Sequence, residues 1–243
     1  MPHRVFCFTV TRASTPERAA LLQATIVGAR RTAAHEFDWH VWNSGCSMEG
    51  KLVLETALAT GAIQDIHGDG TNVGQHVAWN KAYALAKAGG YDAFLRLDDD
   101  CEFISKRWLK KLLSASAKLE DKFILAPTVR GLINPPECSA PVEVEGINLA
   151  FLEDAIGGIC RLHPLPLISD FIADVRKPLG SGDATGIASY CRKKIIPMAY
   201  LRAVRIRHAK TTRTQEESDP EHFSIHQALQ HIPYIPPYTL EGS

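Results

Sequence analysis

The sequence predicts an α/β fold in which a sheet is layered with crossover helices. Over the first hundred residues, short runs of β-forming residues alternate with helical patterns, which is typical of such layers. Residues 4–10 (RVFCFTV) form a nearly continuous apolar run, as expected of a strand buried on both faces. The next segment, from Ser14 to Glu17, combines capping hydroxyls, a proline and a carboxylate, and predicts a helix to about residue 31.

Three more strands are expected before residue 100. Residues 38–43 (DWHVWN) predict the second strand, and a helix over 49–60 and a short strand over 62–67 follow it. Residues 73–88 carry apolar groups at helical spacing, and the glycine pair at 89–90 ends that helix. Residues 93–97 (AFLRL) predict a strand that leads directly into three carboxylates.

The pattern after residue 100 is less regular. It predicts helices over 105–119 and 183–193 and strands over 123–126, 159–171 and 203–207. A proline-rich tail follows from residue 215 and is expected to close over the surface. We therefore expect one domain with two halves, residues 1–100 and 101–214, and a closing segment over 215–243.

Composition excludes several classes of protein. The chain of 243 residues is 45% hydrophobic, enough for a substantial core, and its 27 basic residues balance 27 acidic ones. No global charge therefore draws it to nucleic acid or to an anionic membrane. It shows neither a signal peptide nor a run of about 18 apolar residues, so we expect a cytoplasmic protein. Six single cysteines without a CxxC pair are expected to be reduced, since their spacing fits no zinc finger.

Three adjacent carboxylates, Asp98, Asp99 and Asp100, follow the AFLRL segment. In an α/β sheet, ligands bind at the carboxyl ends of the strands. Carboxylates this close repel one another in a cleft unless a cation neutralises them, and Mg²⁺ or Mn²⁺ can do so while it also binds phosphate oxygens. The cluster thus predicts a metal that holds a diphosphate, and the alternative is a solvated acidic turn.

At this point the sequence resembles the inverting, family 2 type of glycosyltransferase with the GT-A fold. The DxD element of that family matches Asp98 and Asp100 in RLDDDCEF, and NVGQHVAWNKAYALA resembles its asparagine-x-glycine loop and following helix. The resemblance covers roughly residues 5–208. It implies a three-layer α/β/α sandwich with a mixed central sheet and a Rossmann-like nucleotide half.

The resemblance also implies where a nucleotide sugar binds. Asp98 would face the ribose and the metal, and Asp100 would be the main ligand of the metal. Asn43 stands where the family often has an aspartate, so its role is open, and turn chemistry explains asparagine there and at position 72 equally well. The donor-binding residues implied are Thr11, Arg12, Asn43, Asn72, Gly74, Asp98 and Asp99.

A catalytic carboxylate is implied in the second half. The glycine pair at 157–158 and the segment PLGSGDATGIASYCRKK resemble family elements, and Asp183 matches the general base that takes the proton of the acceptor hydroxyl. Gly182 replaces the first acid of that element. Asp183 as a simple helix cap is the alternative, and Glu153 and Asp154 are the reserve candidates for the base.

Further basic and imidazole groups lie just before the tail and within it. His208 resembles the third metal ligand of many relatives, although a lone histidine at a strand end is also a common surface group. The pair His222 and His226 lacks the glutamate of a zinc hydrolase helix, so we interpret it as structural. Eight basic residues and no acidic ones lie between positions 192 and 213, where they can form a solvated face, balance a leaving diphosphate or receive an anionic acceptor.

Together these patterns predict a Mn²⁺- or Mg²⁺-dependent glycosyltransferase that moves a sugar from a nucleotide diphosphate, with a UDP-sugar expected, to an acceptor hydroxyl with inversion. The acceptor can be a saccharide, a lipid-linked group, a protein or a modified nucleic-acid base. A sugar-phosphate nucleotidyltransferase is one alternative, but FTVTRAS lacks its glycine-rich phosphate loop. A non-catalytic module that binds nucleotide sugar or nucleic acid is the other.

Overall fold

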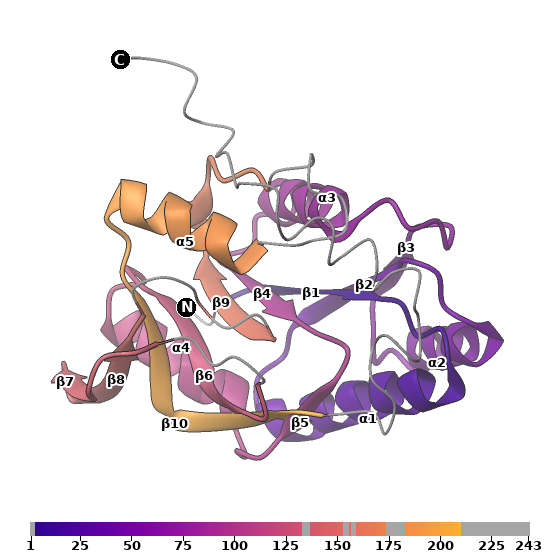
Figure 1. The fold of residues 1–243 in the computed structure, drawn as a ribbon, viewed down its shortest axis with the longest axis horizontal. Helices are drawn as coiled ribbons and strands as arrows, with labels where there is room; N and C mark the ends of the chain where they lie inside the picture. The colour runs from indigo at the N-terminus through magenta and orange to yellow at the C-terminus, as the bar shows by residue number, and fades with distance from the viewer. Residues whose placement is uncertain (1–2, 133–136, 153–155, 157–158, 174–182, 210–243) are drawn as a thin grey trace.

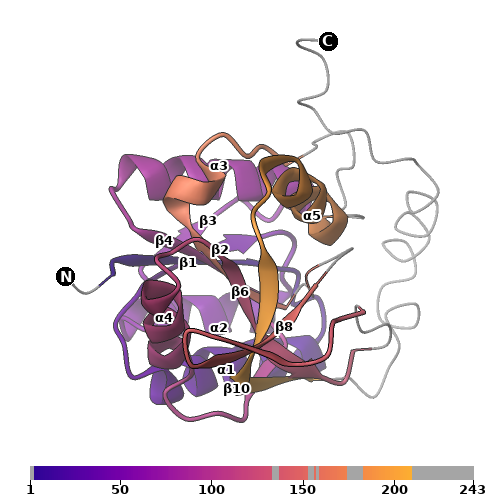
Figure 2. The ribbon, with the colours of Figure 1, turned by 90° about the vertical axis from the view of Figure 1, so that its left-hand side faces the viewer.

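The computed structural model describes residues 3–132, 137–152, 156, 159–173 and 183–209, and they form a three-layer α/β/α arrangement (Figure 1). A ten-stranded sheet forms the middle layer in this part of the chain, with most strands in the order β3-β2-β1-β4-β9-β6-β10-β8-β7 and β5 paired to β10. Helices α1, α2 and α4 cover one face, and α3 and α5 cover the other (Figure 2). The predicted α/β class and mixed sheet are confirmed.

The first half follows the sequence closely. Its strands are β1 (Val5–Thr11), β2 (Asp38–Asn43), β3 (Asp65–His67) and β4 (Ala93–Leu97), and all four are parallel. Six of the seven residues of β1 are buried, as its apolar run predicts. Helix α1 (Pro16–Ala33) begins with Pro16, and its cap is the hydroxyl of Thr15, which accepts a hydrogen bond from the backbone N–H of Arg18.

Helices α2 (Met48–Ala59) and α3 (Gln75–Ala88) complete this half. The hydroxyl of Ser47 caps α2, and Gly74 precedes α3 with a φ of +83°, a conformation that favours glycine. Because β1 to β4 are parallel, their carboxyl ends share one edge of the sheet. That edge carries Thr11, Asn43 and the segment that starts at Asp98.

The second half differs from the prediction in several elements. Strand β6 (Ile124–Arg130) and strand β10 (Met198–His208) are longer than expected, and β5 (Cys101–Phe103) directly follows the acidic triplet. The hairpin β7 (Val142–Val144) and β8 (Ile147–Phe151) was not predicted, because its first strand has only three residues and one of them is charged. Its turn places Glu145 and Gly146 at positive φ.

The strand predicted over 159–171 is only partly correct. Strand β9 (Cys160–Pro164) lies antiparallel between β4 and β6, and a 3-10 helix, η1 (Leu165–Ile168), then replaces it. Two prolines, Pro164 and Pro166, explain the change, because proline has no N–H for the sheet. Helices α4 (Trp108–Lys118) and α5 (Asp183–Lys194) lie close to their predicted ranges.

Three other predictions concern the termini, the cysteines and the membrane. The closing segment over 215–243, with His222 and His226, lies outside the described residues. All six cysteines are free thiols, and five of them are buried. Among the described residues, no helix combines the length and the apolar character that a membrane crossing requires.

Candidate donor and metal site

The candidate site lies at the carboxyl ends of β1 and β4. The chain passes from β1 to β2 on one side and reaches β4 on the other, so these two strands flank the point where the strand order reverses. In α/β sheets a ligand crevice opens at such a point. Thr11 ends β1, and the acidic triplet follows β4 at the same edge.

Asp99 is buried at this site and accepts hydrogen bonds from two side chains. The hydroxyl of Thr11 donates to one carboxylate oxygen at 2.5 Å, and Arg18 donates to the other at 2.7 Å. Burial raises the pKa of Asp99, and the charge of Arg18 opposes that rise. Both oxygens of Asp99 therefore have protein donors, and the contact of Asp99 and Thr11 with a sugar donor stays a prediction.

Asp100 has one engaged and one free carboxylate oxygen. Its Oδ2 lies 3.0 Å from the guanidinium of Arg18 and 3.2 Å from Nε2 of His208. Burial opposes its ionisation, but the hydrogen bond and charge of His208, together with Arg18, lower its pKa overall. Its Oδ1 is buried and has no hydrogen-bond partner among the described residues. A buried carboxylate oxygen without a donor is suited to a cation.

Asp98 faces a different partner. Its Oδ1 lies 3.1 Å from the guanidinium of Arg96, which is itself almost fully buried. The predicted ligands Asp98, Asp100 and His208 do not form a compact group of three in the described part of the chain, although the last two are in contact. The residues that fit a divalent ion best are therefore Asp100 and His208, with Asp98 next to them.

His208 reaches this site because it ends β10. Strand β5, which directly follows the triplet, pairs antiparallel with β10 and places Cys101 opposite His208. The backbone N–H of Ala209 also donates to the carbonyl of Asp100 at 2.8 Å. The hydrogen bond to Asp100 raises the pKa of His208, while burial opposes that change. Residues separated by 108 positions thus meet through one short strand pair.

The loop before α3 is hydrogen-bonded to the segment that follows β2. Oδ1 of Asn72 accepts hydrogen bonds from the hydroxyl of Ser44 and from the N–H of Gly74. Oδ1 of Asn43 accepts from the N–H groups of Gly45 and Cys46. Both asparagines therefore shape turns at the sheet edge, which is the conformational role that the sequence left open beside nucleotide binding.

The structure describes some of the remaining predicted residues and not others. Arg12 lies beside Gly45, with its side chain 3.8 Å from where a Cβ on that glycine would be. Asp183 begins α5, but its side chain is not described, and Gly182, the glycine pair at 157–158, Glu153 and Asp154 lie outside the described residues. The structure therefore gathers the donor-side residues at one edge and leaves the position of the catalytic carboxylate untested.

Arg18 is the main residue that the sequence analysis missed. It bridges Asp99 and Asp100 from the first turns of α1, and Thr25 of the same helix bonds to the backbone around Asp99 and Cys101. These two residues share a helix face with Leu22, Ile26 and Ala29, which are buried. A basic residue in line with that buried stripe was the available signal.

Solved structures resemble this fold, whereas the sequence comparisons found no match. No protein-family model matches the chain, and no curated protein matches its sequence. A crystal structure of GalNAc-T7 with UDP, GalNAc and Mn²⁺ superimposes on 86% of this chain with a TM-score of 0.68 and 11% identity. The fold is that of the GT-A glycosyltransferases.

A second set of GT-A structures, those of S. aureus TarS, agrees. The complex of TarS residues 1–349 with UDP-GlcNAc matches 93% of the chain with a TM-score of 0.59 and 11% identity. A longer TarS structure gives a TM-score of 0.59 and 13% identity. The chain spans 44% of the GalNAc-T7 chain and 39% to 65% of the TarS chains. The similarity establishes the GT-A fold, and the activity is a separate question.

Proposed function

We propose that the chain is a glycosyltransferase that moves a sugar from a UDP-sugar to an acceptor hydroxyl with the help of Mn²⁺ or Mg²⁺. The observation that carries this proposal is the contact of Asp100 with His208 at the sheet edge, where Oδ1 of Asp100 is buried without a donor among the described residues. The GT-A neighbours are consistent with it, since their crystals contain UDP, Mn²⁺ or UDP-GlcNAc. Residues 1–100 would bind the donor, and residues 101–214 the acceptor.

The proposed roles combine the contacts at the sheet edge with the resemblance to family 2 enzymes. Asp100 and His208, with Asp98 beside them, would hold the ion, which supplies positive charge against the departing diphosphate. Arg12, Asn43, Asn72 and Gly74 would surround the nucleotide. Asp183 would take the proton of the acceptor hydroxyl as it attacks the anomeric carbon, and attack on the face opposite the leaving group gives the inversion of family 2 enzymes.

A thermal-shift series with UDP-, GDP-, CMP- and dTDP-sugars, each with and without Mn²⁺, tests the donor assignment. Ligands that bind only the native state raise the melting temperature. We expect a UDP-sugar to raise it only when Mn²⁺ is present. No shift with any of these donors would contradict the proposal.

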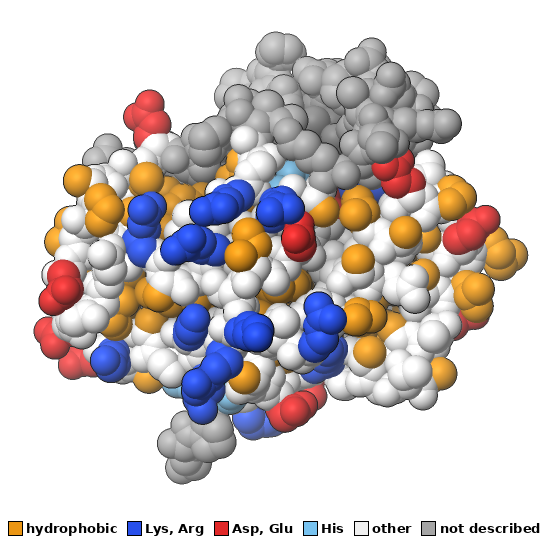
Figure 3. Space-filling model, turned by 90° about the horizontal axis from the view of Figure 1, so that it is seen from below, with side chains coloured by type: hydrophobic (Ala, Val, Ile, Leu, Met, Phe, Trp, Pro, Cys, Tyr) orange, Lys and Arg blue, Asp and Glu red, His pale blue; other side chains and the backbone are white. Residues whose placement is uncertain are grey.

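Strands β6 and β10 carry an arginine cavity, which we define by Thr128, Arg130, Arg202 and Arg205. Its volume is about 520 Å³, and none of the described residues that line it is acidic. Basic side chains gather on the face seen in Figure 3, with few acidic ones among them. The hydroxyl of Thr128 is buried without a hydrogen-bond partner among the described residues. These groups match a phosphate, which guanidinium groups bind in pairs of hydrogen bonds.

The cavity is built by a bulge in β10. Pairing with β6 shifts between Leu201 and Arg205, so the residues between them have no partner in that strand. Bulges of this kind redirect side chains and are common beside active sites. Thr128 lies two residues after Ala126 in β6, so it shares the face of the sheet on which Ala126 packs in the core beneath α5. We therefore propose that the acceptor hydroxyl belongs to a phosphate-bearing molecule.

Substitution of Arg130, Arg202 and Arg205 by glutamine is expected to weaken binding of such an acceptor at least about tenfold. A fluorescent DNA duplex and a polyol phosphate chain are suitable probes, measured by anisotropy at low and physiological salt. The control replaces Arg31, Lys51 and Lys118, which are exposed elsewhere, and removes the same charge. Equal weakening by both triple variants, or loss of UDP-sugar binding, would contradict an acceptor role for the cavity.

A further inference from the structure

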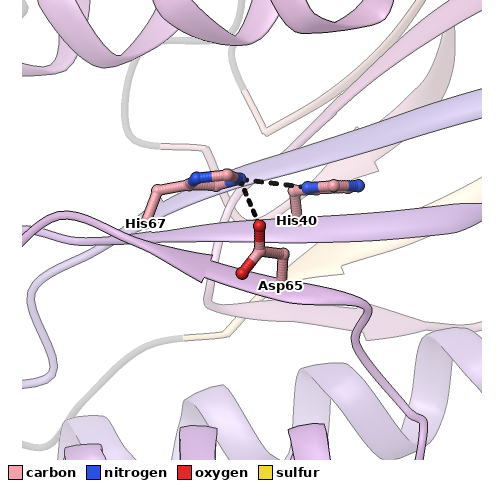
Figure 4. Close-up of side chains that lie close together, drawn as sticks. All are labelled: His40, Asp65 and His67. Atoms are coloured by element: carbon pink, nitrogen blue, oxygen red, sulfur yellow. Dashed lines mark hydrogen bonds and ion pairs between the residues drawn. The ribbon is translucent and has the colours of Figure 1, made fainter. Parts of the chain in front are cut away.

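A second group of potential metal ligands lies away from the acidic triplet, on the outer strands of the sheet. His40 comes from β2, and Asp65 and His67 come from the edge strand β3 (Figure 4). Among the described residues, this is the one set of three histidine, cysteine or acidic side chains whose ligand atoms all lie within 4.8 Å of one another. The proposed transfer reaction does not use these residues.

The register of the two strands brings the three side chains together. His40 lies opposite Asp65, and Trp42 lies opposite His67, so the three share one face of the sheet. Nδ1 of His40 and Nε2 of His67 are 3.0 Å apart, and Nε2 of His67 is 3.5 Å from Oδ2 of Asp65. Around a tetrahedral Zn²⁺ with bonds of about 2.0–2.1 Å, ligand atoms stand about 3.3 Å apart. The distance between the two imidazole nitrogens is shorter than that value, and the distance from His67 to Asp65 is longer.

Neighbouring groups fix the orientation of these ligands. The ring of His40 stacks on Phe6 with centroids 4.5 Å apart, and it lies nearly parallel to the ring of His67. The other oxygen of Asp65 accepts the N–H of Ile66 at 2.8 Å, which leaves Oδ2 directed at His67. Such supporting contacts are typical of metal sites, in which they hold the ligands in place.

We propose that His40, Asp65 and His67 bind a transition-metal ion, with Zn²⁺ as the expected one, separately from the ion of the donor site. Two imidazoles and one carboxylate suit Zn²⁺, whereas Mg²⁺ and Mn²⁺ prefer oxygen ligands. The ion takes the place of the proton in the hydrogen bond between the two imidazoles. That proton moves to the other ring nitrogen of its own histidine, so that each neutral imidazole binds the ion through one nitrogen and keeps one proton on the other. A fourth position stays open to water.

The bound ion would link β3 to β2 through its ligands. Strand β3 has only three residues and lies at the edge of the sheet. Its last residue, His67, leads directly into the loop that carries Asn72 and Gly74. An ion bound to His67 would therefore restrain the start of the loop that carries Asn72 and Gly74. It would leave the acidic triplet unchanged.

The test uses the purified chain with Zn²⁺ alone, or with Co²⁺ as a spectroscopic probe, and without Mn²⁺ or nucleotide. We expect one tightly bound Zn²⁺, visible absorption bands typical of tetrahedral Co²⁺, and a melting temperature raised by roughly 5–10 °C at about 100 times the dissociation constant. His67→Gln and the exposed-site change Asp65→Asn are each expected to weaken Zn²⁺ binding at least about tenfold.

Two control variants separate this site from other histidines. His35→Gln changes a histidine whose Nε2 contacts the backbone carbonyl of His3, and His208→Gln removes the histidine of the donor site. Both are expected to keep the Zn²⁺ and the Co²⁺ bands. Absence of bound Zn²⁺ in the wild type, unchanged binding in His67→Gln and Asp65→Asn, or loss of the ion in His208→Gln would overturn the proposal. None of these outcomes bears on the UDP-sugar experiment.

Discussion

Replacing Asp100 by asparagine is expected to abolish the Mn²⁺-dependent thermal shift with UDP-sugar and to lower turnover of the donor by about 10²- to 10³-fold. The substitution keeps the size of the side chain but removes the negative charge. Asp100 is the carboxylate of the triplet that contacts His208, and its Oδ1 has no donor among the described residues. Among the described residues, Asp100 is the one carboxylate with a buried oxygen that lacks a hydrogen-bond donor.

Glu102→Gln is the matched control for this change. Glu102 lies two residues further along, and its carboxylate is exposed and pairs with Arg207. Loss of that charge is expected to leave the thermal shift and the turnover intact. The melting temperature of the free Asp100→Asn protein separates a folding defect from a binding defect. A normal Mn²⁺-dependent shift in Asp100→Asn would remove this residue from the metal site.

Asp183→Asn is expected to keep the UDP-sugar thermal shift and to lose transfer by about 10²- to 10⁴-fold, the range that a general base contributes. An alcohol, or water, attacks poorly until its proton is taken, so hydrolysis of the donor falls together with transfer. Turnover is measured by release of UDP, with and without an acceptor. The family resemblance and the place of Asp183 at the start of α5 are what support this role.

Glu153→Gln and Asp154→Asn are the controls for the general base. Both are expected to keep turnover, because they precede the glycine pair and are out of order for the family. Full activity in Asp183→Asn combined with loss in either control would transfer the role to that residue. A wild-type chain that binds UDP-sugar but never turns it over, even with water, would instead be a binding module on a GT-A fold.

Local patterns were sufficient to predict the first half of the fold, residues 1–100. The run at residues 4–10 is buried as β1, and the glycine at 89 ends α3 where expected. The position of the acidic triplet at a strand end was also predictable, because an apolar strand followed by charge is a local signal. These features depend on neighbours in sequence, which one chain displays directly.

Contacts between distant residues could not be predicted in the same way. Strand β10 extends well beyond residues 203–207, because its bulge exposes Arg202 and Ala203 and interrupts the apolar pattern. Arg18 reaches residues 81 and 82 positions away, and nothing in the local pattern specifies that partner. The group on β2 and β3 likewise depends on the register of two strands, which hydropathy alone does not determine.

The pairing of Arg18 and Arg96 with the triplet has a consequence for the order of binding. Three carboxylates face two guanidinium groups in this site, which leaves a formal excess of one negative charge. An anionic diphosphate approaching such a site is repelled. A dication reverses the sign of the excess to positive, so the site attracts phosphate only after, or together with, the ion. The nucleotide sugar would therefore bind after the metal or as a complex with it, and not before it.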